Sequence, residues 1–151
     1  MVFYYIYPLL TTIHTSQMLS NSSKYAIKAL VHLVNHSSED NKILVKNLAK
    51  ATEVPQPYLS KLLQQLTAKN YLSSVKGRNG GYFITESQGE NSVLDIIVGI
   101  EDKDILQQCI LNFENCDNKN PCSIHHLVAS QKDALRNSFK DIKLKDLATQ
   151  N

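Results

Sequence analysis

Three cysteines and two histidines gather in one short stretch of this 151-residue chain. Six residues separate Cys109 from Cys116, five separate Cys116 from Cys122, and His125 and His126 follow closely. The segment is rich in Asn and Asp, whereas structural cysteines usually lie in a core as small hydrophobic side chains. Thiolates and a neutral imidazole are donors that a soft metal centre uses. The stretch is therefore a candidate metal site.

The spacing favours an iron–sulfur cluster over zinc. Zinc sites typically use cysteines two to four residues apart. The wider gaps seen here suit a cluster, which takes four ligands and accepts histidine in place of cysteine. A helix that begins at Cys122 would place Cys122 and His125 on one face, which supports His125 as fourth ligand. A thiol–disulfide switch, zinc and inert cysteines stay open as alternatives.

Apolar residues at helical spacing predict the elements that must carry this segment. The expected helices cover residues 20–35, 45–52, about 57–70, 92–100 and 122–140, with short elements at 104–109 and 143–147. Serines at 20–23 provide capping oxygens for the first helix. In the second helix, Leu44, Leu48 and Ala49 are expected on the inner side. The chain is thus predicted to be mainly α-helical.

The second and third helices form a helix-turn-helix pattern, joined by a turn at Val54-Pro-Gln-Pro57. The positions of the third helix that face outward are polar or aromatic: Gln56, Tyr58, Ser60, Lys61, Gln64 and Gln65. Strand-like residues at 71–75 and 82–85 flank a glycine-rich turn with Lys76 and Arg78. This hairpin is a wing with a cationic tip. A phosphate-binding loop is disfavoured because no helix follows the glycines.

The last long helix has an apolar stripe with no evident partner in so short a chain, so a second copy is expected to cover it. The fold class is therefore a winged helix-turn-helix domain plus a long C-terminal dimerisation helix. The predicted organisation is a non-native or disordered extension at 1–17, the winged-helix domain at 18–100, the cysteine-rich loop at 101–122, and the dimerisation helix and tail at 123–151.

Charge is distributed unevenly although the net charge is only +2. Residues 42–78 carry seven basic residues and one acidic residue, and residues 79–118 carry eight acidic residues and one lysine. A basic segment that includes the helix-turn-helix and the wing indicates a surface for a polyanion such as nucleic acid.

Residues 1–17 contain no Lys, Arg, Asp or Glu, and they lack the basic start and cleavage site of a secretory signal. The apolar run before Pro8 is too short to span a bilayer. We expect an extension upstream of an initiator at Met18, and a cytoplasmic protein without membrane association. The sequence contains no recognisable catalytic base, nucleophile or cofactor loop, so we expect neither an enzyme nor a small-molecule substrate.

The sequence resembles regulators of the IscR/NsrR/CymR type, the Rrf2 family. Three motifs carry the resemblance together with the late Cys-Cys-Cys-His loop: Leu19-Ser-Asn-Ser-Ser-Lys-Tyr-Ala-Ile-Lys-Ala-Leu30, Tyr58-Leu-Ser-Lys-Leu-Leu63 and Ser74-Val-Lys-Gly-Arg-Asn-Gly-Gly-Tyr82. The resemblance implies a homodimer that reads a palindromic operator in double-stranded DNA, with the third helix in the major groove and the wing in the minor groove.

The resemblance also assigns roles to individual residues. It implies DNA contacts by Gln56, Ser60, Lys61, Lys76 and Arg78, while Tyr58 either contacts the DNA backbone or packs. It implies a cluster, of the 2Fe–2S rather than the 4Fe–4S type, held by Cys109, Cys116, Cys122 and His125.

The ligand set resembles that of some family members more than others. NsrR-type members have an acidic residue where this chain has Lys24, and CymR-type members lack the cysteines, so IscR-type members match better. One departure is the first cysteine gap, which has six residues where IscR has five. A cluster-free regulator of the same fold, which uses a thiol/disulfide switch or a protein partner, is the alternative.

Overall fold

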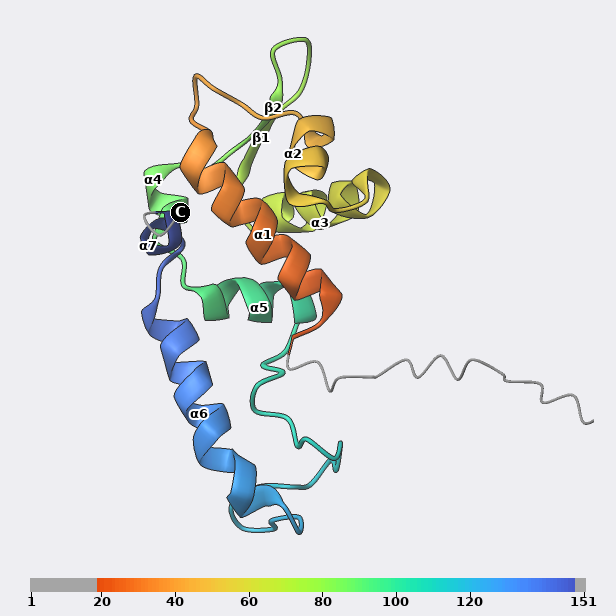
Figure 1. Cartoon of the computed structure of the whole chain (residues 1–151), viewed down its shortest axis with the longest axis vertical. Coiled ribbons are helices and arrows are strands. Elements are labelled where there is room, and N and C mark those ends of the chain that lie inside the picture. Colours follow the sequence, from red (N-terminus) through yellow and green to blue (C-terminus); the bar gives the residue numbers. More distant parts are fainter. Residues whose placement is uncertain (1–18, 149–151) are drawn as a thin grey trace, which may run out of the picture.

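The computed structural model of the chain describes residues 19–148, so the extension predicted at 1–17 and the start proposed at Met18 lie outside it. The described elements are α1 (Asn21–His36), α2 (Val45–Thr52), α3 (Gln56–Ala68), β1 (Ser73–Val75), β2 (Gly81–Phe83), α4 (Glu86–Gly89), α5 (Val93–Glu101), α6 (His125–Asp141) and α7 (Leu144–Leu147). The prediction of a mainly helical winged-helix fold is confirmed (Figure 1).

The helices begin where their capping residues predict. The Ser20 hydroxyl accepts a hydrogen bond from the Ser23 amide at the start of α1, and Ser92 and Asp95 form a capping box at the start of α5. The sequence analysis missed α4, although Thr85 and Gln88 form a second capping box. Helix α6 begins at His125, three residues later than predicted, because the backbone before it forms the end of the cysteine loop.

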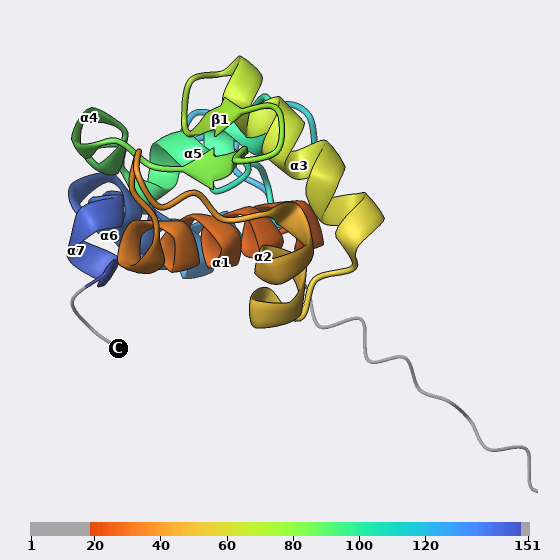
Figure 2. The same ribbon diagram turned by 90° about the horizontal axis from the view of Figure 1, so that it is seen from above.

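Helices α1, α2, α3 and α5 lie close together in the view from above (Figure 2), and one hydrophobic core connects them. Most of its fully buried members come from α1, α2, α3, α5 and α7, and include Leu30, Leu48, Leu63, Ile96 and Leu144. The prediction that Leu44 lies on the inner side of α2 is wrong, because this residue precedes the helix and is 52% exposed.

The two strands form an antiparallel hairpin in which Ser74 pairs with Tyr82. Two glycines make this hairpin possible. A Cβ at Gly80 would lie 2.2 Å from the Val75 carbonyl oxygen, and Gly81 has a φ of +149° with the Ile43 backbone next to it. The close backbone contacts and the positive φ in this hairpin therefore explain why glycine occupies these two positions.

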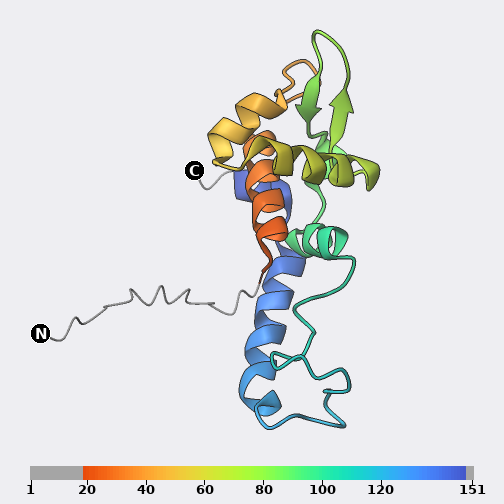
Figure 3. The same cartoon turned by 90° about the vertical axis from the view of Figure 1, so that its right-hand side faces the viewer.

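The wing and the cysteine loop lie at opposite ends of the molecule (Figure 3). The chain leaves the body after α5, passes through a long segment without regular structure, and returns along α6. Helix α7 then packs on α1, where Leu144 is fully buried. Within residues 19–148, no helix is both long and apolar enough to span a bilayer.

Candidate metal centre and nucleic-acid interface

The three cysteines converge although they lie far apart along the loop. The Sγ atoms of Cys109, Cys116 and Cys122 all lie within 4.8 Å of one another, and those of Cys109 and Cys122 are 3.7 Å apart. Nδ1 of His125 lies 3.3 Å from Sγ of Cys116. The four predicted ligand residues are thus neighbours in space, and all four are partly buried.

Turns in the loop bring these side chains together. The Asn112 amide donates to the Cys109 carbonyl, and the His125 amide donates to the Cys122 carbonyl. One turn therefore separates Cys122 from His125, as predicted, although Cys122 lies before α6 and His125 is nearest to Cys116. The Cys122 amide also donates to Sγ of Cys116, at 3.4 Å.

Asn118 is a residue of this site that the sequence analysis missed. Its Oδ1 lies 3.0 Å from Nε2 of His125, so it holds the proton on Nε2 and leaves Nδ1 free to act as a ligand. A metal-binding histidine usually has such a partner for its second nitrogen. The Asn-rich composition around Cys116 was the only signal in the sequence.

The thiol of Cys109 has a lowered pKa. Desolvation raises the pKa of Cys109, but backbone hydrogen bonds from Phe113 and Leu111 and the thiols of Cys116 and Cys122 lower it, to about 7 overall. A thiolate is the form that binds metal and attacks disulfides.

The pKa of Cys116 shifts in the other direction. A backbone hydrogen bond from Cys122 lowers it, but desolvation, the two neighbouring thiols and the charge of Cys109 raise it overall. The group therefore contains one readily formed thiolate next to a thiol that resists ionisation without a metal.

The donor set and its spacing fit a metal centre. A metal–sulfur bond of about 2.3 Å with tetrahedral geometry places two thiolates roughly 3.7 Å apart, which is the separation of Cys109 and Cys122. Cys116 and His125 form a second close pair. Three thiolates and an imidazole can hold an iron–sulfur cluster or a single tetrahedral ion such as zinc.

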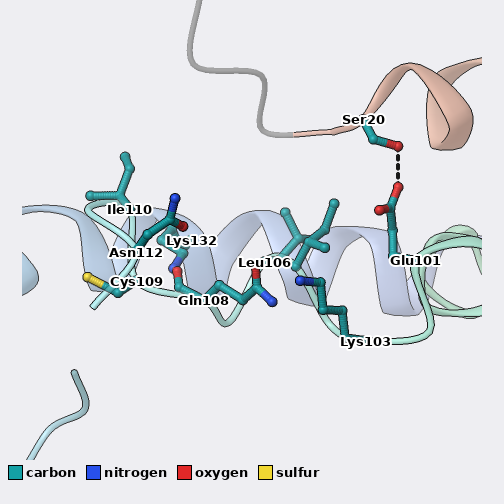
Figure 4. Close-up of a pocket in the computed structure, with 10 residues that line it drawn as sticks. Ser20, Glu101, Lys103, Leu106, Gln108, Cys109, Ile110, Asn112 and Lys132 are labelled. Carbon is teal, nitrogen blue, oxygen red and sulfur yellow. Dashed lines mark hydrogen bonds between the residues drawn. The ribbon is translucent and has the colours of Figure 1, made fainter. Parts of the chain in front are cut away.

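A groove of about 430 Å³ adjoins this centre and continues towards the beginning of α1 (Figure 4). Cys109 lines one end, and Ser20 and Glu101 line the other, where the Ser20 hydroxyl donates to the Glu101 carboxylate. The Ser23 hydroxyl donates to the same carboxylate oxygen at 2.6 Å. The cysteine loop is therefore connected to the winged-helix body through the end of α5.

The predicted DNA-contacting residues lie on α3 and the wing. Gln56, Lys61, Lys76 and Arg78 are exposed. Ser60 is only partly exposed, and its hydroxyl donates to the Gln56 carbonyl. The four exposed polar or basic side chains are available to a phosphate backbone or to base edges.

Tyr58 and Gln65 both contact neighbouring elements. Tyr58 is 39% exposed, and its ring packs edge-on against Tyr25 with 5.6 Å between ring centroids. The prediction that Gln65 faces outward is wrong, because its side-chain amide donates to the Ile100 carbonyl at 3.1 Å.

Comparison with known proteins identifies the family. Residues 19–150 match the Rrf2 family, which is described as iron-dependent transcriptional regulators. The chain belongs to the Rrf2 family of transcriptional regulators. This assignment confirms the resemblance noted in the sequence, and it places the chain in a family of DNA-binding regulators rather than enzymes.

Individual relatives agree with this assignment. A protein of Aquifex aeolicus described as an HTH-type transcriptional regulator is 30% identical over 132 residues, which cover 86% of this chain and 90% of the relative. The regulator IscR of Photorhabdus laumondii is 24% identical over 129 residues, which cover 85% of this chain and 77% of IscR.

A solved structure shows the same fold. The global cysteine regulator CymR of B. subtilis superposes with a TM-score of 0.71 at 20% identity, over 88% of this chain and 97% of CymR. CymR and this chain therefore share the arrangement of helices and wing.

Proposed function

We propose that this Rrf2 regulator senses iron–sulfur cluster, redox or nitric oxide status through a cluster held by Cys109, Cys116, Cys122 and His125. The observation that carries the proposal is the convergence of three sulfur atoms within 4.8 Å, with an imidazole nitrogen 3.3 Å from one of them. The similarity to IscR supports the same assignment, and a 2Fe–2S cluster suits two pairs of ligands.

When bound, the cluster would supply a centre that reacts with oxidants or nitric oxide. The residues of the chain would bind the cluster and orient its ligands. Cys109 would supply a readily formed thiolate, Cys116 would be ionised when the metal binds, and Asn118 would orient the imidazole of His125. The loop would then be ordered by ligation, and its ordering would differ between the two states of the regulator.

On the DNA side, the regulator is proposed to read a palindromic operator in double-stranded DNA. Gln56, Ser60 and Lys61 on α3 would enter the major groove, and Lys76 and Arg78 would reach the adjacent minor groove. Tyr58 is proposed to support α3 through its contact with Tyr25, with any DNA contact limited to its exposed edge.

A homodimer is proposed because α6 has no buried residue in the single chain. Leu127 is 71% exposed, although it lies in the apolar stripe of this helix. Leu127→Glu should produce a monomer in sedimentation velocity, whereas Lys140→Glu on the opposite face should not.

We retain the proposed organisation into a winged-helix domain at 18–100, a cluster loop at 101–122 and a dimerisation segment at 123–151, in a protein that acts in the cytoplasm.

The decisive experiment is anaerobic purification of the full chain, followed by an absorbance spectrum and assays of iron, acid-labile sulfide and zinc. We expect visible absorbance with iron and sulfide in equal amounts. Cys109→Ala and His125→Ala should lose or shift this absorbance, whereas His126→Ala, a matched control at the neighbouring exposed histidine, should keep it. Zinc without sulfide, or unchanged colour in the Cys109 variant, would refute the proposal.

A cluster-free thiol switch is the second candidate, and one observation favours it. Sγ of Cys109 and Sγ of Cys122 are already 3.7 Å apart, and Cys109 ionises readily. The switch would be favoured over the cluster if iron-free, reduced protein binds DNA as tightly as protein reconstituted with iron and sulfide. It should then lose affinity when added hydrogen peroxide, reduced to water, oxidises Cys109 and Cys122 to a disulfide that mass spectrometry detects.

A further inference from the structure

The last turn of α5 and its C-cap residue, positions 99–102, are where the end of α3 contacts the start of the cysteine loop. The Gln65 amide donates to the Gly99 and Ile100 carbonyls at 3.4 and 3.1 Å. The Lys69 ammonium donates to the Gly99 carbonyl at 2.6 Å and forms an ion pair with Asp102. Two side chains at the C-terminal end of α3 therefore donate hydrogen bonds to the C-terminal end of α5.

These bonds satisfy a specific need of α5. The last four carbonyls of a helix have no partner within the helix, and the negative end of its dipole attracts a cation. Gln65 supplies donors to two of these carbonyls, and Lys69 supplies both a donor and a positive charge. A change in the end of α5 would therefore alter the partners of α3 directly.

Close packing makes this contact sensitive to small movements. A Cβ on Gly99 would lie 2.4 Å from the Tyr71 ring, so the backbone of α5 is in close contact with this ring, three residues after the end of α3. Packed interiors have little free space to absorb a shift. Movement of Gly99 would therefore displace Tyr71 and the end of α3 with it.

The residues between this turn and Cys109 are held by α1 and α6. Glu101 accepts hydrogen bonds from serines at the beginning of α1. Two residues beyond Asp102, the Asp104 carboxylate pairs with Arg136 of α6 at 2.5 Å. Lys132 of α6 donates to the Gln108 carbonyl, next to Cys109. The segment between the first cysteine and α5 is thus short and held at both ends.

We propose that Gln65 and Lys69 are positioning residues that couple the cysteine loop to the DNA-reading helix. Neither residue is among the proposed metal ligands or the predicted DNA contacts. Their hydrogen bonds to the end of α5 set the position of α3 according to the arrangement of the loop. This inference rests on the proposed function for its biological meaning, because it makes ligation at Cys109 a signal that reaches α3.

The first test uses metal-free, reduced full-length protein and amide hydrogen exchange. Lys69→Met should raise exchange about fivefold in two separate segments at once, residues 65–71 and residues 101–109, because each loses its support. Lys69→Arg keeps a cationic donor and should restore protection in both segments. Lys28→Met removes an exposed lysine of α1 and should change neither. Faster exchange confined to residues 65–71 would overturn the coupling.

The second test measures the response to loading. The probe is a DNA duplex selected from a random pool by the wild-type protein. We measure the Kd for this duplex before and after anaerobic reconstitution of the protein with ferrous iron and sulfide, and take the ratio of the two values. In Lys69→Met, the iron content should match wild type while this ratio moves at least about threefold closer to one. An unchanged ratio would overturn the inference. Failure of the wild-type protein to take up iron and sulfide would instead refute the proposed function, and the exchange test then decides the coupling.

Discussion

The phenol oxygen of Tyr58 lies 2.5 Å from the hydroxyl oxygen of Ser22, which joins the first turn of α3 to the first turn of α1. The contact explains why an aromatic residue lies on the exposed face of a helix that is otherwise polar there. Together with the edge-on packing against Tyr25, it fixes the end of α3 that is predicted to read DNA.

Removing the phenol hydroxyl should therefore weaken the fold slightly. Tyr58→Phe should lower the free energy of unfolding by about 1 kcal/mol, the usual net value of one hydrogen bond, as measured by urea denaturation. Ser22→Ala should cost a similar amount, and the double variant should cost no more than either alone. Full additivity of the two changes would show that the hydroxyls do not interact.

A methyl group at Gly99 should disturb the fold more strongly. Gly99→Ala places a Cβ 2.4 Å from the Tyr71 ring, so we expect a loss of about 1–3 kcal/mol from overpacking. Gly89→Ala is the matched control, because its Cβ would meet only Lys145 at an ordinary 3.5 Å. Thermal denaturation of both variants checks this, and equal melting temperatures would contradict the close contact.

Basic residues at the proposed DNA surface should influence the salt dependence of binding. Lys61→Ala and Arg78→Ala should each weaken binding to a selected duplex and reduce the slope of log K against log salt by about 1, if each contacts one phosphate. Lys119→Ala, in the cysteine loop at the far end of the molecule, should leave the slope unchanged (Figure 3). A salt slope equal to wild type in both test variants would exclude phosphate contacts.

Acidification should destabilise the protein through His32. Partial burial, and then the charge of His36, lower the pKa of His32 below its ordinary value of 6.5. The unfolded chain therefore binds this proton more readily, and stability falls as the pH decreases below 6.5 towards the lowered value. His32→Gln should flatten that part of the stability profile. His36→Gln removes the second cause and should flatten it partly, and profiles identical to wild type would contradict the assignment.

Local signals in the sequence were sufficient for most helices. Val45–Thr52 was predicted with its observed bounds, because apolar spacing and the following turn are properties of a few neighbouring residues. Helix α4 has only four residues, too few for a periodic pattern, so its capping residues were the only indication.

The predictions were wrong or incomplete where residues distant in the sequence determine the environment of a side chain. Gln65 lies on a polar face of α3, but its partners are carbonyls about 35 positions later in the chain. An amphipathic pattern shows which face of a helix is polar, but it does not show whether that face contacts water or the end of a neighbouring helix. Likewise, Leu144 was assigned to a terminal element, and only the fold shows that it completes the core between α1 and α7.

The cysteine site was predictable in its residue types and less so in its geometry. Spacing indicated that Cys109, Cys116, Cys122 and His125 could meet. The proximity of His125 to Cys116 and the role of Asn118 depend on turns that residue spacing does not encode.

The segment between α5 and α7 returns to the place from which α5 began. Ser92 and Lys143 form a backbone bridge, and the Leu144 amide donates to the Asn91 carbonyl. A detour with anchored ends can change in length or composition without disturbing the remainder of a fold. The chemistry at the tip of this detour can therefore change during evolution while the winged-helix body keeps its fold.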